Sequence, residues 1–260
     1  MNIIITGGNS QVGKILCRDL QKSHKITTAG RSGCDLVFDL NDNSTFSQIR
    51  DFDLVIHCAH SYSGQKIDNI DLNLLAAQEL FAICETLPNT RVMFISSNSA
   101  HVYSRSQYGR IKGEIEVLSK KFSSVESVRL GFVCDEQFSN KLVLKALRIA
   151  RKMKFLVLPY GEKLLYRRYT SRQIILALQI PTVVEERQIW DSLEAESLSL
   201  HSLLSAELRD LGFKGPVFKL PLIFFKSPIW ILYFLMRLGA IESHKIDPLL
   251  SFRGYSYNGW

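Results

Sequence analysis

Short apolar runs alternate with longer helical stretches through the first half of the chain. The runs predict strands at residues 2–6, 25–28, 36–38, 53–57, 91–96 and 127–130. Helices are expected over 11–22, 68–87 and 106–121. Strands separated by helices predict βαβ units, and strands that are apolar throughout suit a parallel sheet covered on both faces. The pattern therefore predicts a doubly wound α/β fold.

The second half of the chain follows a different pattern. Beyond about Cys134 it is irregular, interrupted by prolines and mostly helical, with one more plausible sheet segment. We expect residues 1–134 to form the main domain and a segment near 165–185 to return to it. Residues 135–260 are expected to form a small, mostly helical lobe.

Residues 217–238 are the most apolar stretch of the chain. Two lysines and two prolines interrupt it, and its longest uncharged piece, residues 227–236, is too short to cross a bilayer. A buried helix is the simpler interpretation. The alternative is a helix that lies on a membrane surface or on a partner protein, because basic residues flank the apolar ones.

The composition is that of an ordinary globular protein. Hydrophobic residues make up 46% and charged residues 22% of the 260 residues, which excludes a disordered chain. The five cysteines lie far apart, without a CxxC pair or a histidine at ligand spacing, so neither a metal site nor a disulfide framework is expected. With no signal peptide recognisable at the N-terminus, a cytoplasmic protein is expected.

Positive charge is concentrated between Lys141 and Arg172. This segment holds ten basic side chains against one acidic one, a net of +9, while the whole chain carries +7. It is either a solvated basic helix face or a binding surface for an anionic partner such as a diphosphate. A nucleic acid is disfavoured as the partner, because no aromatic platform or binding motif accompanies the charge.

A glycine-rich turn follows the first strand and opens the first helix. Its sequence, TGGNSQVG over residues 6–13, suits the approach of a pyrophosphate to backbone amides and to a helix N-terminus. The turn resembles the TGxxGxxG motif of the extended short-chain dehydrogenases/reductases, the NAD(P)-dependent epimerase/dehydratase family. Ser10 stands where that motif has its middle glycine. The resemblance implies a Rossmann fold whose C-terminal lobe binds the substrate.

The end of the second strand bears on the choice of cofactor. An NAD site usually has an acidic residue there to hold the ribose 2′-hydroxyl, whereas Arg31 suits a 2′-phosphate, so NADP(H) is favoured over NAD(H). The resemblance also implies an adenine contact at Asp39 and Leu40. The cofactor-binding residues expected on these grounds are Gly7, Asn9, Ser10, Gln11, Val12, Gly13, Arg31, Ser32, Asp39, Leu40, Cys58, Ala59, His60, Asn73, Ser97, Tyr108 and Lys112.

Tyr108 and Lys112 form a YxxxK motif at the start of a predicted helix. The spacing puts both side chains on one helix face, where the ammonium is expected to lower the pKa of the phenol. Such a tyrosine can exchange a proton with a carbonyl or carbinol while a nicotinamide carries hydride. Tyr62 and Lys66 also match the motif, but they lie in a predicted loop, whereas Tyr108 follows the fifth strand, as in the family.

A serine completes the expected catalytic set. The segment ISSNSAHVY, residues 95–103, resembles the ISS…VYG segment of the family, whose catalytic Ser or Thr lies three residues before the valine. This position is Ser99. Ser97 is the alternative, because the loop is one residue longer than usual. No metal is expected at the site.

The resemblance leaves two reactions open on a nucleotide-linked sugar. A 4,6-dehydratase is disfavoured, because Ala100 and His101 occupy the positions of its acidic pair. A ketoreductase or an epimerase remains, with reduction favoured because NADPH is the usual biosynthetic donor. Arg167 and Arg168 are the expected substrate-binding residues, since they would suit the diphosphate.

Three further interpretations remain open at this stage. The chain could bind NADP without turning it over, as a sensor or subunit. It could instead be a peripheral membrane enzyme on a lipid-linked sugar, with residues 217–238 as the docking surface. A homodimer through the predicted helices 68–87 and 106–121 would fit the family, although no residue here demands it.

Overall fold

The computed structural model describes most of the chain, and the following account concerns these residues alone. They are residues 1–104, 106–133, 135, 141–160, 166–169, 189–191 and 197–221.

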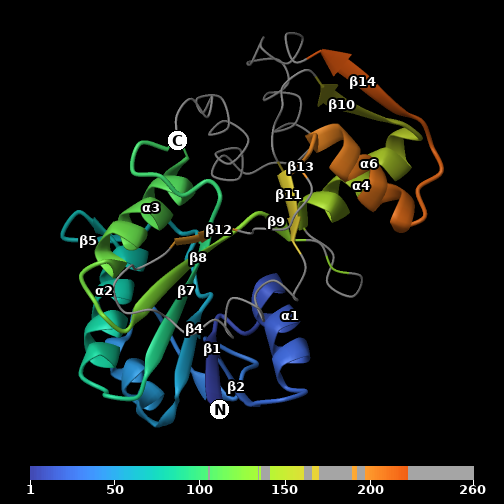
Figure 1. The fold of residues 1–260 in the computed structure, drawn as a ribbon. Coiled ribbons are helices and arrows are strands. Elements are labelled where there is room, and N and C mark those ends of the chain that lie inside the picture. The colour runs from blue at the N-terminus through green and yellow to red at the C-terminus, as the bar shows by residue number, and fades with distance from the viewer. Residues whose placement is uncertain are drawn as a thin grey trace.

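A seven-stranded parallel sheet forms the centre of the N-terminal part (Figure 1). Its strands are β1 (Asn2–Thr6), β2 (Lys25–Gly30), β3 (Leu36–Val37), β4 (Leu54–His57), β7 (Arg91–Ser97), β8 (Val125–Leu130) and β12 (Ile189–Asp191). Their order is β12-β8-β7-β4-β1-β2-β3, and every neighbouring pair is parallel. This is the doubly wound Rossmann arrangement predicted from the sequence.

Helices cover both faces of this sheet. α1 (Gln11–Leu20) lies on one face, while α2 (Leu72–Glu85) and α3 (Gln107–Ser119) lie on the other, as Figure 1 shows. A 3₁₀ segment, η1 (Asn43–Asp51), packs beside α2. Crossovers on two faces require a sheet that is buried on both sides, which agrees with its apolar strands.

Successive side chains of the central strands enter two different cores. In β1, Ile4 packs into the cluster beneath α2 and α3, whereas Ile3 and Ile5 pack against α1. All three are at most 1% exposed. The same alternation occurs in β4 and β7, because side chains of a strand point to opposite faces in turn.

The second helix begins four residues later than the sequence suggests. Residues 68–71 were expected to be helical, but a hairpin of β5 (Lys66–Ile67) and β6 (Ile70–Asp71) precedes α2. Asp68 and Asn69 form its turn with φ angles of 50° and 65°. Asx residues tolerate this left-handed conformation, and two consecutive ones specify a tight hairpin turn. Asp71 then caps α2.

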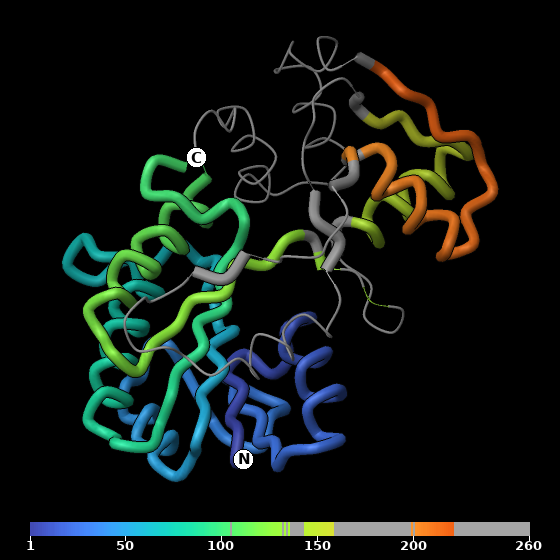
Figure 2. The backbone as a smooth tube through the Cα atoms, viewed as in Figure 1, coloured from blue at the N-terminus to red at the C-terminus, as the bar shows by residue number. Residues whose placement is uncertain are grey.

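A smaller unit with its own core follows the main sheet along the chain (Figure 2). It contains α4 (Lys141–Met153), β10 (Leu156–Tyr160), α6 (Leu200–Asp210) and β14 (Val217–Pro221), with β10 and β14 paired in parallel. The short strands β9 (Phe132–Val133), β11 (Tyr166–Tyr169) and β13 (Ser197–Leu198) form another sheet. The sequence predicts only one more sheet segment after residue 134, and this is wrong, because the structure has several short strands there. Their pairings join distant parts of the chain, which a local sequence pattern does not reveal.

The apolar stretch 217–238 is described only at its start. Residues 217–221 form β14, so a helix is the wrong prediction for them, and Phe218 is 52% exposed. The remaining residues, 222–238, lie outside the described part. Across the described residues, no helix is both long enough and apolar enough to span a bilayer.

Candidate active site

The glycine-rich turn lies at the carboxyl end of β1, between β2 and β4, where the strand order reverses. Gly7 has a φ of +69°, and a Cβ atom there would lie 2.7 Å from the backbone nitrogen of Ala59. A Cβ on Gly13 would lie 2.5 Å from the carbonyl oxygen of Gly7. Both positions therefore need glycine, and the turn packs closely against α1 and against the segment after β4. In this fold the carboxyl ends of the strands next to this point are the usual dinucleotide site.

Ser10 has a definite structural role in this turn. It is the N-cap of α1, and its Oγ accepts a hydrogen bond from the backbone N–H of Gly13 at 3.0 Å. Its φ of −68° and ψ of 161° are ordinary extended values, so the backbone at this position does not require glycine. The replacement of the family's glycine is thus compatible with an intact turn, and the turn and helix N-terminus fit a pyrophosphate.

The loop after β2 is held close to the glycine-rich turn. The side-chain amide of Asn9 donates a hydrogen bond to the carbonyl of Ser32. Asp35 accepts hydrogen bonds from the backbone N–H and the hydroxyl of Thr28, both at 2.8 Å, and these lower the pKa of its carboxyl. The carboxylate is therefore tied back to β2, while Arg31 is exposed on the loop.

Two further expected cofactor residues are engaged in local structure. Asp39 accepts hydrogen bonds from the backbone and side-chain amides of Asn41. Asn73, 4% exposed, accepts from the backbone N–H of Ser61 at 2.7 Å and donates to its carbonyl at 2.9 Å. Asn73 therefore fixes the loop after β4, and a direct contact with the cofactor stays a prediction.

Tyr108 and Lys112 lie on one face of α3, as their spacing predicts. The Nζ atom of Lys112 lies 5.9 Å from the centre of the Tyr108 ring and 4.4 Å from that of Phe94. It donates a hydrogen bond to the carbonyl of Ile95 at 2.8 Å. Lys112 is 3% exposed, and burial lowers the pKa of its ammonium to about 8.

The pKa of Tyr108 is shifted in the direction opposite to the expectation. Burial of the phenol raises it, and the nearby Tyr62 adds to the rise. A side-chain hydrogen bond with Ser97 acts in the other direction but is the weaker influence. Desolvation of the anion thus outweighs the stabilisation expected from the ammonium. The phenol of Tyr108 therefore holds its proton more tightly than that of an exposed tyrosine.

The two candidate serines belong to one hydrogen-bond chain. Ser97 ends β7 and bonds to Tyr108, and its Oγ lies 3.0 Å from the Oγ of Ser99. The structure therefore places Ser97, the alternative, next to the phenol, and Ser99 one step behind it. Close packing of this loop on α3 depends on Gly109, whose position leaves no room for a Cβ beside the Ser99 carbonyl.

The rings of His60, Tyr62 and Tyr108 contact one another, and the sequence did not predict this contact. The Tyr62 ring lies 5.8 Å from the Tyr108 ring at an interplanar angle of 18°, and His60 packs edge-on to both. From the sequence, His60 is expected to contact the cofactor, and Tyr62 belongs to a second YxxxK match. Lys66, its partner in that match, lies in the β5 strand of the hairpin, so the second match is not a helical pair.

Two charged pairs support the elements that carry the site. Arg129 on β8 forms a bidentate ion pair with the buried Glu116 of α3, with N–O distances of 2.9 and 2.6 Å. Arg18 on α1 forms another with Asp135, beyond β9, at 2.8 and 2.7 Å. The first holds α3 against the sheet, and the second holds α1 to the start of the C-terminal part.

The role of the two expected substrate-binding arginines stays a prediction. Arg167 and Arg168 lie in β11, which pairs with β9 and β13. Arg172 lies outside the described residues. Among the described residues, no group of three or more His, Cys, Asp or Glu side chains is arranged to hold a metal ion.

The strand order and the helices on both faces of the sheet define the fold as a Rossmann fold. Residues 3–126 match the model of the NAD dependent epimerase/dehydratase family, so the resemblance carried by the motifs is confirmed over this part of the chain. No match to a curated protein was found by sequence.

Solved structures with the same fold cover most of the chain. They include dTDP-4-dehydrorhamnose reductase from Bacillus anthracis in complex with NADP (TM-score 0.67, 16% identity, 86% of each chain covered). UDP-N-acetylglucosamine 4-epimerase from Bacillus cereus has a TM-score of 0.62, 15% identity and 85% coverage of both chains. MoeE5, in complex with UDP-glucuronic acid and NAD, has a TM-score of 0.64 and 17% identity over 85% of this chain and 86% of its own.

Proposed function

We propose that this chain is an NADP(H)-dependent oxidoreductase that acts on a nucleotide-linked sugar, with reduction of a keto sugar as its reaction and epimerisation as the alternative. The observation that carries the proposal is the Ser97–Tyr108–Lys112 group at the carboxyl edge of a Rossmann sheet. The family match and the nucleotide-sugar enzymes among similar structures support it.

Different residues of the chain would bind the cofactor, hold the substrate and transfer the proton in such a reaction. Residues 7–13 would hold the pyrophosphate, Arg31 the 2′-phosphate, and the nicotinamide cofactor supplies hydride when bound. Ser97 holds the substrate carbonyl oxygen next to Tyr108, whose O–H gives that oxygen its proton. Lys112 stabilises the phenolate that results.

Reduction is favoured over epimerisation because Arg31 suits the 2′-phosphate of NADP(H), and NADPH is the usual donor in biosynthetic reductions.

A dinucleotide-binding protein without turnover is the second candidate. The observation that favours it is the packing of His60 and Tyr62 against the ring of Tyr108, which covers part of the side chain on which catalysis depends. A membrane-docked enzyme on a lipid-linked sugar keeps the same chemistry, and its docking segment lies mostly outside the described residues.

Turnover of 4-keto sugars linked to UDP or dTDP tests the proposal, with NADPH oxidation as the readout. Wild-type protein is expected to oxidise NADPH, and Tyr108→Phe to lower kcat by about 10²- to 10⁴-fold while NADPH still binds. Ser97→Ala is expected to reduce kcat more than Ser99→Ala. Tyr103→Phe is the matched control, because Tyr103 is 83% exposed. NADPH binding without turnover of any such substrate would instead establish the second candidate.

A further inference from the structure

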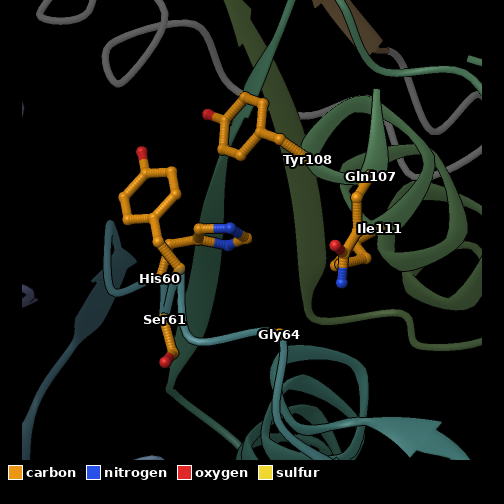
Figure 3. A pocket seen from close by; sticks show the side chains of 7 residues that line it. His60, Ser61, Gly64, Gln107, Tyr108 and Ile111 are labelled. Atoms are coloured by element: carbon orange, nitrogen blue, oxygen red, sulfur yellow. The ribbon is translucent and has the colours of Figure 1, made fainter. Parts of the chain in front are cut away.

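A depression beside Tyr108 is lined by two separate elements (Figure 3). The loop after β4 provides its first side and the start of α3 its second. The lining residues are His60, Ser61, Tyr62, Gly64, Gln107, Tyr108 and Ile111. The depression is small and partly open to solvent, so part of a ligand can rest against its wall, but a whole nucleotide sugar cannot be enclosed in it.

One wall of this depression is an exposed aromatic face. Tyr62 is 62% exposed although its ring is nearly parallel to that of Tyr108. His60 lies 4.7 Å from the Tyr62 ring and 4.9 Å from the Tyr108 ring, close to perpendicular to both. The three rings support one another, so Tyr62 presents a fixed flat surface on which the C–H face of a sugar ring can stack.

A polar atom without a partner lies in the same wall. The Nδ1 atom of His60 is buried and accepts or donates no hydrogen bond within the described residues. Such buried atoms are rare and need an explanation. Asn73 holds the next residue, Ser61, by two hydrogen bonds, so the position of the imidazole is fixed. It offers a preformed hydrogen-bonding position to a ligand next to Tyr108.

The lining carries no charge to balance an ionised ligand group. None of the lining residues is acidic, lysine or arginine. Burial lowers the pKa of His60 to about 2, so its imidazole is neutral. The nearby ammonium of Lys112 is directed at the Ile95 carbonyl. A carboxylate placed against this wall would lose part of its water without gaining a counter-ion, which is unfavourable.

We propose that His60 and Tyr62 determine specificity for the sugar ring of the substrate. Tyr62 stacks on the ring, His60 hydrogen-bonds to one of its hydroxyls, and together they select a neutral hexose over a uronic acid. This inference rests on the proposed function and goes beyond it, because it assigns the selection to two side chains outside the Ser97–Tyr108–Lys112 group.

Calorimetric titration of the full chain with pairs of ligands tests this assignment. UDP-glucose, UDP-glucuronic acid and UDP are compared, together with dTDP-glucose and dTDP. The neutral sugar is expected to add about tenfold to the affinity of the better nucleotide, and the uronic acid to add nothing. Tyr62→Leu and His60→Ala should each remove most of that gain and leave the affinity for the nucleotide diphosphate alone unchanged. Tyr62→Phe should keep the gain, as should the control Tyr103→Leu.

The outcomes separate failure of this assignment from failure of the proposed function. Equal affinities for UDP-glucose and UDP-glucuronic acid would overturn the assignment, and so would a gain that survives both variants. In those cases the nucleotide still binds and the proposed function stands. Absence of binding by all five ligands would refute the nucleotide-sugar substrate, and the assignment with it.

Discussion

Replacement of Ser10 by alanine removes one hydrogen bond at the start of α1 and little else. Ser10 is exposed, so no cavity forms, and its extended backbone angles suit alanine equally well. The change removes the N-cap hydrogen bond that the backbone N–H of Gly13 donates to the Oγ of Ser10. Loss of such a cap costs about 1 kcal/mol, whereas glycine at the same position costs only a few tenths.

Thermal unfolding of three proteins without cofactor measures this difference. Ser10→Ala should lower Tm by about 2–4 °C relative to wild type, and Ser10→Gly by about 1 °C or less. The order wild type, glycine, alanine is specific to an N-cap, because intrinsic helix propensity would put alanine above glycine. An alanine variant that is as stable as wild type, or more stable than the glycine variant, would refute the assignment of Ser10 as the cap.

Two further predictions concern buried charges near the site. Glu116→Gln should cost about 3 kcal/mol in the free energy of unfolding, because it leaves Arg129 without its buried partner. Removal of the more exposed Arg91 from its pair with Glu126 should cost less than about 1 kcal/mol, and equal losses in urea titrations would contradict this. Lys112 is expected to make the free energy of unfolding rise with pH in the alkaline range. Its pKa in the folded protein, about 8, lies below the ordinary 10.5, so the unfolded chain binds more protons between these two pH values. Relative to Lys112→Met, wild type should therefore gain stability from about pH 8 to 10.5, by at most about 3 kcal/mol, and a difference that is flat over this range would refute it.

The sequence was most informative where structure depends on local pattern. The strands of the first half and both long helices of the opposite face were predicted within a few residues, since runs such as residues 2–6 are apolar on both faces. The start of α2 was misplaced because Asp68 and Asn69 were taken as helical, although they form a hairpin turn. The short strands after residue 134 could not be predicted, because β10 and β14 pair across about sixty residues.

In the candidate site, too, the sequence predicted what depends on local spacing and missed what depends on tertiary packing. Tyr108 and Lys112 were found from spacing, which fixes which side chains share a helix face. The proximity of Ser97 to Tyr108 depends on the path of a loop, and the contact of Tyr62 with Tyr108 joins two elements about 45 residues apart. The raised pKa of Tyr108 reflects burial, which depends on the tertiary packing and is not contained in the YxxxK spacing.

Binding of NADPH and NADH to the purified protein tests the central claim most directly. Energy transfer from the three tryptophans to the reduced nicotinamide, or calorimetry, measures both affinities. We expect NADPH to bind at least about tenfold more tightly than NADH, and Arg31→Asp to abolish this preference. If neither dinucleotide binds, or if Arg31→Asp leaves the affinity for NADPH unchanged, the proposed cofactor site is wrong.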